Sequence, residues 1–315
     1  MKKKILSVIL VTTVIFSITG CGNKETPANT AEQETAEVAS TEAEAPAETE
    51  AVTETDSATE ASAETIPGPD SDDTTISIGV TPVPHAEIVN DVVKAKLEAA
   101  GWTVDVVEFN DYVQPNTSLE DGDLDANYFQ TIRYLEEQNE SRNLHLKDVA
   151  GIHLEPMGLY ASSAASLEEL PDGASIAIPN DGSNESRALK LLADNQLIEL
   201  SETEDLYNLT NISSNPHNFE FVELEAANLP RSLQDVDAAV INGNYALEAD
   251  LNPQTDALVA ELAESDESYK YINYLVVKEG NEETAKTKAL IAALQNEDVK
   301  AYIENKYSGS VIPAF

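Results

Sequence analysis

Arg187 combines a charged side chain with a position that does not favour it. It lies in the first turn of a helix predicted for residues 184–195, where the helix dipole disfavours a cation. A bound carboxylate here would contact both the guanidinium group and the helix N-terminus. An ion pair between Arg187 and Glu185 or another acidic residue explains the position equally well, so the sequence leaves both interpretations open.

Two asparagines are also candidates for ligand binding. Asn242 follows the apolar run AAVI and precedes Gly-Asn-Tyr, and Asn273 lies inside the apolar strand YINYLVV. An amide in such surroundings is costly unless it is paired, and it both donates and accepts hydrogen bonds. Each could bind an amino or a carboxylate group, although each also fits a purely structural role.

Residues 108–135 combine aromatic rings with short amides in the sequence EFNDYVQPNTSLEDGDLDANYFQTIRYL. Rings such as Tyr112, Phe129 and Tyr134, placed beside Asn, Gln and Asp, suit a pocket for a small molecule that is part apolar and part polar. An aromatic-rich turn of the core is the alternative interpretation.

Patterns typical of metal sites and of enzymes are missing from the sequence. The four histidines are scattered, and no H-x-x-x-H or H-E-x-x-H spacing occurs. Asp121, Asp123 and Asp125 resemble the start of an EF-hand loop, but the glycine and glutamate that complete it are absent. There is also no G-x-S-x-G, Walker or G-x-G-x-x-G motif. We therefore expect no metal, no cofactor and no enzymatic activity.

The first 20 residues predict a lipoprotein signal peptide. Lysines at positions 2–4 precede an apolar segment, residues 5–18, which is short for a membrane span. Thr19 and Gly20 then lead into Cys21, the single cysteine, as in a bacterial lipobox. We expect lipidation of Cys21 and a lipid-anchored protein on the extracytoplasmic face of the cell membrane. Ordinary signal cleavage is the alternative.

Residues 21–74 predict a disordered acidic linker. They consist largely of Ala, Thr, Glu and Ser, with Lys24 as the only base, and cannot bury a core. The whole chain has a formal net charge of −40. This charge argues against nucleic acid as a partner.

Strands and helices alternate in the remaining chain. A strand at 76–80, a helix at 87–100 and a strand at 102–109 predict a parallel βαβ unit. Residues 144–160 predict one or two extended segments, and Ser166 is expected to open a short helix through a capping box. Further strands are expected at 174–179, 219–224, 238–241 and 271–277, and further helices at 131–142, 184–195, 283–294 and 298–306. This α/β pattern favours two lobes over one large sheet.

The chain from residue 75 to 315 resembles the methionine-binding lipoproteins of ABC importers, the NlpA/MetQ family. The segments that carry the resemblance are IGVTPVPHAEI, EFNDYVQPNTSLEDGDLDANYFQ, IAIPND, FEFVELEAANLPRSL and VINGNYA. The resemblance implies a two-lobed, periplasmic-binding-protein-like α/β fold with the ligand cleft between the lobes. Lobe 1 would comprise residues 75–161 and 272–315, and lobe 2 residues 162–271.

The resemblance also assigns roles to the candidate residues. Arg187 matches the family arginine that binds the ligand carboxylate, and Asn242 and Asn273 match asparagines that hold the amino-acid head group. Residues that match the side-chain pocket are Tyr112, Phe129, Thr131 and Tyr134. Thr131 replaces a family histidine, and Arg133 replaces a family proline, so the side-chain pocket departs from the family pattern.

The implied function is extracytoplasmic binding of an amino acid, with L-methionine as the first expectation, and delivery to an ABC permease and its ATPase. D-methionine or a Met-containing dipeptide would keep the transport role. A surface adhesion or antigen-like lipoprotein without a small ligand is an alternative from another class. A metal receptor using His85 or His153 and an extracytoplasmic enzyme are further alternatives.

Overall fold

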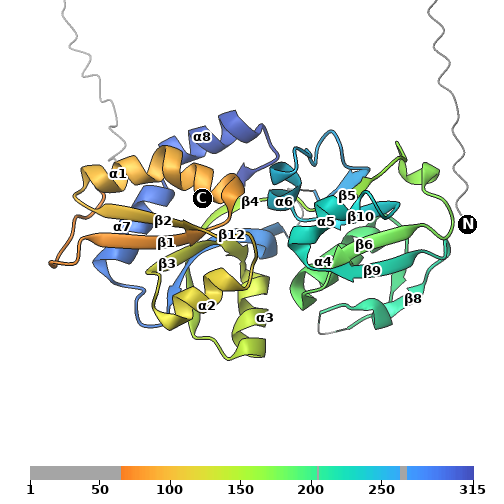
Figure 1. The fold of residues 1–315 in the computed structure, drawn as a ribbon, viewed down its shortest axis with the longest axis horizontal. Coiled ribbons are helices and arrows are strands. Elements are labelled where there is room, and N and C mark those ends of the chain that lie inside the picture. The colour runs from red at the N-terminus through yellow and green to blue at the C-terminus, as the bar shows by residue number, and fades with distance from the viewer. Residues whose placement is uncertain (1–64, 204–205, 263–267) are drawn as a thin grey trace, which may run out of the picture. The chain divides into compact units, whose positions relative to one another are not determined.

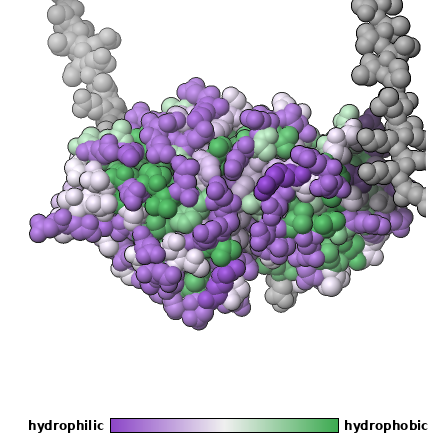
Figure 2. Space-filling view, viewed as in Figure 1, coloured by the Kyte–Doolittle hydropathy of each residue, from purple (hydrophilic) through white to green (hydrophobic). Residues whose placement is uncertain are grey.

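The computed structural model describes residues 65–203, 206–262 and 268–315. The predicted signal peptide, Cys21 and most of the predicted linker lie outside these residues. Within them, no helix has the length and apolar character needed to cross a membrane. Figure 2 shows polar residues over most of the visible face of the described part, with apolar residues in separate patches.

Two sheets organise the described chain into two lobes (Figure 1). The first sheet has the order β13-β4-β12-β3-β1-β2. β1 pairs in parallel with β2 and β3, whereas β12 pairs antiparallel with β3 and β4. Its strands are β1 (Thr75–Val80), β2 (Thr103–Glu108), β3 (Ala126–Thr131), β4 (Leu146–Leu154), β12 (Ile272–Lys278) and β13 (Ile312–Pro313).

The second sheet has the order β11-β5-β10-β6-β9. β6 pairs in parallel with β9 and β10, and β5 pairs antiparallel with β10 and β11. Its strands are β5 (Gly158–Ala161), β6 (Ser175–Pro179), β9 (Glu220–Leu224), β10 (Ala238–Ile241) and β11 (Val259–Ala260). A separate small ribbon joins β7 (Glu199–Leu200) to β8 (Ile212–Ser214).

Helices cover both faces of each sheet (Figure 1). In lobe 1, α1, α7 and α8 pack on one face of the sheet, and α2 and α3 pack on the other. In lobe 2, α4 covers one face, and α5 and α6 cover the other. The α-helices are α1 (Lys94–Ala99), α2 (Gln114–Asp121), α3 (Ile132–Arg142), α4 (Gly182–Asp194), α5 (Leu229–Ser232), α6 (Gly243–Glu248), α7 (Ala285–Leu294) and α8 (Glu297–Tyr307).

Short helical turns complete the elements. Two π-helical turns, Pro82–Ala86 and Val89–Val93, lead into α1, so the helix predicted for 87–100 is only partly α-helical. Ser166 makes no side-chain cap to the 3-10 turn Leu167–Glu169, so the predicted capping box does not form; the Glu169 carboxylate accepts from the backbone of Ala165 instead. The remaining 3-10 turns are Leu209–Asn211, Ala226–Asn228 and Ser268–Tyr271.

β10, the central strand of the lobe 2 sheet, shows how one apolar strand packs against helices on both of its faces. Ala238 and Val240 of β10 pack against α4, whereas Ala239 and Ile241 pack against α5 and α6. All four side chains are fully buried. A strand buried on both faces reads as a continuous apolar run, as AAVI does.

The chain crosses between the sheets earlier than predicted. β4 ends at Leu154 in the first sheet, and β5 begins at Gly158 in the second, so residues 158–161 belong to lobe 2 and not to lobe 1. Pro156 separates the two extended runs and cannot donate to a sheet, which interrupts pairing at this point. The chain returns to the first sheet at β12, which begins at Ile272.

The predicted disordered linker also ends earlier than expected. Ile66 packs on the core of lobe 1, and the Trp102 indole Nε1 donates to the carbonyl oxygen of Pro67 over 2.8 Å. Lys286 forms an ion pair of 2.7 Å with Asp73. These contacts attach residues 65–74 to the folded part. The segment TIPGP supplies an apolar side chain, Ile66, and the Pro67 carbonyl for these contacts, unlike the Ala/Thr/Glu sequence before it.

In each lobe, an aspartate and a serine form the same pair of hydrogen bonds between two strands of the sheet. The Asp125 carboxylate, just before β3, accepts from the backbone and hydroxyl of Ser77 in β1 over 2.8 and 3.1 Å. The Asp237 carboxylate, just before β10, accepts from the backbone and hydroxyl of Ser175 in β6, both over 2.8 Å. Both pairs join the amino-terminal ends of parallel strands, which leaves the carboxyl-terminal ends to form the site.

Candidate functional site

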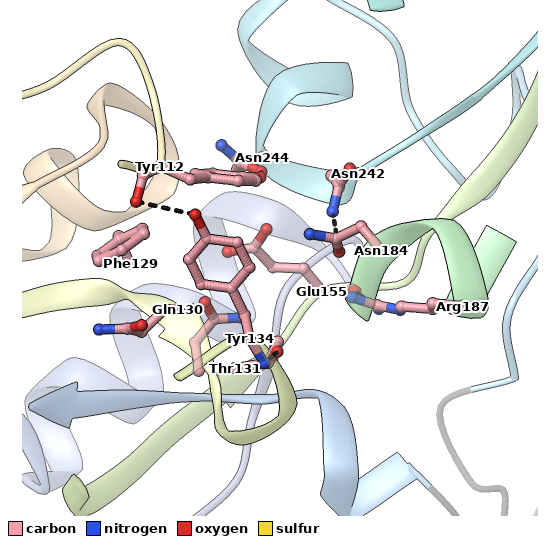
Figure 3. Close-up of a pocket in the computed structure, with 12 residues that line it drawn as sticks. Tyr112, Phe129, Gln130, Thr131, Tyr134, Glu155, Asn184, Arg187, Asn242 and Asn244 are labelled. Atoms are coloured by element: carbon pink, nitrogen blue, oxygen red, sulfur yellow. Dashed lines mark hydrogen bonds between the residues drawn. The ribbon is translucent and has the colours of Figure 1, made fainter. Parts of the chain in front are cut away.

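A pocket lies between the lobes, and all seven ligand-binding residues predicted from the sequence line it (Figure 3). Its cavity volume is only about 20 Å³, so the surrounding side chains nearly fill it in this structure. Its lining residues are Tyr112, Phe129, Gln130, Thr131, Tyr134, Glu155, Asn184, Arg187, Asn242, Gly243, Asn244 and Asn273. The structure thus brings together residues separated by up to 161 positions in the sequence (112 to 273).

The strand ends explain why these residues meet. Phe129 and Thr131 lie at the carboxyl end of β3, and Tyr112 lies in the loop after β2. In lobe 2, Arg187 comes from α4 after β6, and Asn242 directly follows β10. Ligands of open α/β sheets bind outside the carboxyl ends of the parallel strands, so the topology places both sets at one cleft.

Aromatic rings form the lobe 1 wall. The Tyr112 ring centroid lies 5.8 Å from Phe129, 5.6 Å from Tyr134 and 4.9 Å from Tyr245. The Tyr134 hydroxyl donates to the backbone carbonyl oxygen of Tyr112 over 3.1 Å, which fixes the Tyr134 ring beside Tyr112 (Figure 3). The Thr131 hydroxyl caps α3 by accepting from the Tyr134 backbone over 3.3 Å. Thr131 is therefore both a pocket residue and a helix cap.

Arg187 lies in the second turn of α4, not in the first turn as predicted. The helix begins at Gly182, because the Asp181 carboxylate caps it by accepting from the backbone of Asn184 over 2.9 Å. The helix N-terminus therefore lies farther from the guanidinium group than the sequence argument assumed.

The partner of Arg187 is Glu261, not Glu185. Arg187 Nε and Nη2 donate to the two carboxylate oxygens of Glu261 over 2.7 and 2.6 Å. Nη2 also donates to the backbone oxygen of Glu155 over 2.8 Å, and the ring of Tyr271 stacks 4.2 Å from the guanidinium carbon. Arg187 is only 6% exposed. The bidentate pair holds the guanidinium group rigidly at the pocket wall.

Asparagines at the lobe 2 wall carry polar atoms without a partner. Asn242 donates to the Asn184 side-chain oxygen over 2.8 Å (Figure 3), but its own Oδ1 has no hydrogen bond within the described chain. Asn244 Oδ1 accepts from the Tyr112 hydroxyl over 2.5 Å, whereas its Nδ2 has no partner there. Buried polar atoms are nearly always paired, so one free acceptor and one free donor at this wall are suited to hydrogen bonds with a polar group placed in the pocket.

Behind the pocket lies a buried network that the sequence did not reveal. His153 Nε2 lies 2.6 Å from Glu155 Oε1, and its Nδ1 contacts the Tyr128 hydroxyl. His85 Nε2 lies 3.2 Å from Asn273 Oδ1 and 3.4 Å from Glu155 Oε1. Burial lowers the pKa of His85 to about 4 and that of His153 to about 3, and it raises the pKa of Glu155. Both imidazoles are therefore neutral at pH 7.

Two of the four histidines predicted to be scattered, His85 and His153, thus converge, although their spacing suits hydrogen bonds better than a metal. His85, His153 and Glu155 offer ligand atoms within 4.8 Å of one another. Two ligand atoms of a tetrahedral zinc lie about 3.3 Å apart, given metal–ligand bonds of about 2.0 Å. The 2.6 Å between His153 and Glu155 is instead the distance of a strong hydrogen bond.

Sequence reasoning missed Gln130, Glu155, Asn184, Gly243 and Asn244. Gln130 is held by buried amides, since it exchanges hydrogen bonds of 2.9 and 2.6 Å with Asn116. Asn244 had a signal, because it sits two residues after Asn242 at a strand's carboxyl end. Glu155 had only a weak signal: His153 lies two residues before it, but its second histidine partner, His85, lies 70 positions earlier in the sequence.

Comparison with known proteins identifies relatives along almost the whole described chain. A family model described as NlpA lipoprotein matches residues 76–315. The methionine-binding lipoprotein MetQ of Bacillus subtilis is 38% identical over 252 residues, which cover 78% of this chain and 90% of the relative. The membrane lipoprotein TpN32 of Treponema pallidum is 37% identical over 244 residues, with 77% and 89% covered.

Solved structures agree with the two-lobed fold. A nutrient binding protein from Burkholderia cenocepacia bound to methionine is 41% identical, has a TM-score of 0.72, and is matched over 76% of this chain and 100% of that one. A lipoprotein from Ruminococcus gnavus is 45% identical with a TM-score of 0.75, over 77% of this chain and 100% of that one. The family membership predicted from sequence is confirmed: this chain belongs to the NlpA lipoprotein family.

Proposed function

We propose that this protein is an amino-acid receptor of an ABC importer and that its ligand is L-methionine. The observation that carries the proposal is the pocket itself, which combines a cation, a carboxylate and unpaired amide atoms with a wall of aromatic rings. This arrangement complements a zwitterion with an apolar side chain. The relatives named as methionine-binding, and the Burkholderia protein bound to methionine, support the same ligand.

The two ends of the ligand would meet different walls. Arg187, Asn242 and Asn273 would hold the head group, because the guanidinium and amide groups supply donors for the carboxylate and acceptors for the ammonium group. The aromatic wall formed by Tyr112, Phe129 and Tyr134 would contact the side chain. A thioether gains roughly 0.3–1.5 kcal/mol per contact with an aromatic ring.

Thr131 would decide how strictly the pocket selects its ligand. It stands where the family pattern has histidine, and it leaves more room beside Phe129. The pocket could therefore also accept D-methionine or a Met-containing dipeptide. Several relatives are named D-methionine-binding.

The rest of the chain would place this receptor outside the cytoplasm. Residues 1–20 would be removed as a signal peptide, Cys21 would carry the lipid anchor, and the acidic linker would separate the anchor from the lobes. The lobes, residues 75–157 with 272–315 and residues 158–271, would close on the ligand by a hinge motion. A permease and its cytoplasmic ATPase would then receive it. The relatives reported above are named as binding proteins or lipoproteins, not enzymes.

A thermal-shift assay tests the ligand. The protein is first unfolded and refolded to remove any bound molecule, then heated with L- and D-amino acids and Met-containing dipeptides. A ligand at 100 times its dissociation constant adds about 2.7 kcal/mol of stability. For a protein of this size, that is a shift of roughly 5–10 °C. Folded protein that shifts with no amino acid would contradict the proposal and favour a surface adhesion lipoprotein.

Arg187→Ala tests the site. Loss of a buried charged contact to the carboxylate should weaken L-methionine binding by about 2 kcal/mol or more, a factor of about 30. The matched control is Arg231→Ala, since Arg231 is exposed and lies outside the pocket. Circular dichroism checks that both variants fold. Wild-type affinity in a folded Arg187→Ala protein would refute this assignment of the head-group site.

A further inference from the structure

Among the described residues that line the pocket, Glu155 is the only acidic one and Arg187 the only basic one. Glu155 lies in the first crossing between the lobes and is 4% exposed. Figure 3 shows its side chain between the aromatic wall on one side and Asn184 and Arg187 on the other. Its position therefore gives it access to whatever occupies the pocket.

Arg187 does not neutralise this carboxylate directly. Its Nε and Nη2 are bound to the carboxylate of Glu261, and it contacts Glu155 only through the backbone oxygen. The two imidazoles beside Glu155 are neutral at pH 7, because burial depresses their pKa values. Within the described residues, the Glu155 carboxylate therefore has hydrogen-bond donors but no direct ion pair with a lysine or arginine, and Arg187 acts on it only at a distance.

The donors around Glu155 are arranged to support a carboxylate. Burial raises the pKa of Tyr128, so its hydroxyl keeps its proton and donates to Nδ1 of His153. The proton of the neutral imidazole is then on Nε2, which donates to Glu155 Oε1 over 2.6 Å. On the other side, His85 Nε2 donates to Asn273 Oδ1 and lies 3.4 Å from the same Glu155 oxygen. Burial raises the pKa of Glu155, whereas the nearby charge of Arg187 and a hydrogen bond from the backbone N–H of Asn244 lower it and favour the charged form of the carboxylate.

Gly243 shows that this position of Glu155 is built into the fold. A Cβ atom at Gly243 would lie 2.7 Å from Glu155 Cβ and 3.3 Å from Glu155 Oε2. Only a residue without a side chain lets the start of α6 approach the carboxylate so closely. The same approach brings Asn242 Oδ1, an acceptor without a partner in the described chain, to the same pocket.

We infer that the Glu155 carboxylate is the counter-ion of the ligand's α-ammonium group and thereby selects amino acids with a free amino group. This inference rests on the proposed function. An ammonium group has three donors, and Glu155 and Asn242 Oδ1 supply two acceptors in the pocket. His153 and His85 act as positioning residues, since they contact Glu155 from behind the pocket. Arg187 and the free Nδ2 donor of Asn244 remain for the ligand carboxylate.

Selectivity among methionine derivatives follows from this assignment. A peptide with methionine at its second position, or N-acetylmethionine, has no ammonium group at the α-carbon of methionine and should bind poorly. The α-hydroxy analogue, 2-hydroxy-4-(methylthio)butanoate, keeps the thioether and the carboxylate but lacks the positive charge. It therefore isolates the contribution of the ammonium group.

The test compares L-methionine with this hydroxy analogue by isothermal titration calorimetry on the purified protein. Wild-type protein should prefer methionine by about 30-fold or more, since removal of one partner of a buried charge pair has an effect of this size. Glu155→Gln should lose most of this preference through weaker binding of methionine, with little change for the analogue. The control Glu225→Gln removes an equal charge from an exposed position in the neighbouring groove and should keep the wild-type ratio.

The outcomes separate the two proposals. If wild-type protein binds methionine and the analogue equally well, or if folded Glu155→Gln keeps the wild-type ratio, the role of Glu155 is wrong although the protein is a methionine receptor. If wild-type protein binds no amino acid, the proposed function fails and the inference fails with it. The wild-type ratio alone can overturn the inference even if Glu155→Gln does not fold.

Discussion

Mild acid should destabilise this protein through its two buried histidines. In the unfolded chain each imidazole has a pKa near 6.5, but in the folded protein burial lowers it to about 4 for His85 and about 3 for His153. The folded state therefore binds fewer protons than the unfolded state between these values. A depressed histidine pKa gives stability that is present above pH 6.5 and is lost as the pH falls.

The size of the effect follows from these pKa values. Lowering the pH from 7.5 to 5.5 protonates each histidine in the unfolded chain but not in the folded one, at a cost of roughly 1–2 kcal/mol each and about 3 kcal/mol together. The raised pKa of Glu155 acts in the opposite direction, because protonation of a buried carboxyl favours the folded state. This opposing effect grows with the extent to which the folded-state pKa of Glu155 lies above its ordinary value of 4.5, so the figure of about 3 kcal/mol describes the two histidines alone.

Urea denaturation of ligand-free protein, followed by circular dichroism at several pH values, measures this loss. The net charge of −40 also changes with pH, so the informative quantity is the difference between variants measured under the same conditions. His153→Gln should lose roughly 1–2 kcal/mol less than wild type between pH 7.5 and 5.5. His217→Gln, at an exposed position, is the surface control. Identical pH slopes for wild type and His153→Gln would refute the reasoning.

Two further substitutions test contacts around the pocket. Gly243→Ala places a Cβ atom 2.7 Å from Glu155 Cβ and 3.0 Å from the Pro156 backbone oxygen. It should reduce the free energy of unfolding, measured by urea titration, by about 1–3 kcal/mol. Unchanged stability would show that α6 shifts easily to accommodate the methyl group. Tyr112→Phe removes the 2.5 Å hydrogen bond to Asn244 that joins the two lobes, and small-angle X-ray scattering should show a larger radius of gyration in ligand-free protein. An unchanged radius with unchanged methionine affinity would show that this bond does not hold the lobes together.

The fold was largely predictable where one strand or helix carries its own pattern. The run AAVI marks β10 from Ala238 to Ile241, and the rule for strand ends then points to Asn242. The stretch 108–135 was harder, because aromatic and amide residues hide both α2 and β3. Pro115 in the first turn and the left-handed Gly122 after the last were the available signs of α2.

The buried network could not be predicted, because sheet order creates it. β12 inserts between β3 and β4, so Asn273 pairs with Thr131 on one side and with His153 on the other. His85 reaches the same place from the turn after β1. The spacing of residues along the sequence cannot reveal these contacts, because they form only when β12, more than a hundred residues after β4, pairs with it. The early crossing at Pro156 was missed for the same reason, since both flanking runs look like ordinary strands.

Arg187 touches both of the chain segments that connect the lobes. It donates to the backbone oxygen of Glu155 in the first crossing and to the carboxylate of Glu261 in the second. The backbone N–H of Met157 also donates to the Glu261 carboxylate, over 2.8 Å. If the lobes open about these two segments, Arg187 lies at the pivot of the motion. Atoms at a pivot move least, so we expect Arg187 to keep its position in the open form, whereas the Tyr112–Asn244 contact at the rim breaks. A ligand would then dock first at the pivot and be enclosed afterwards by the rim.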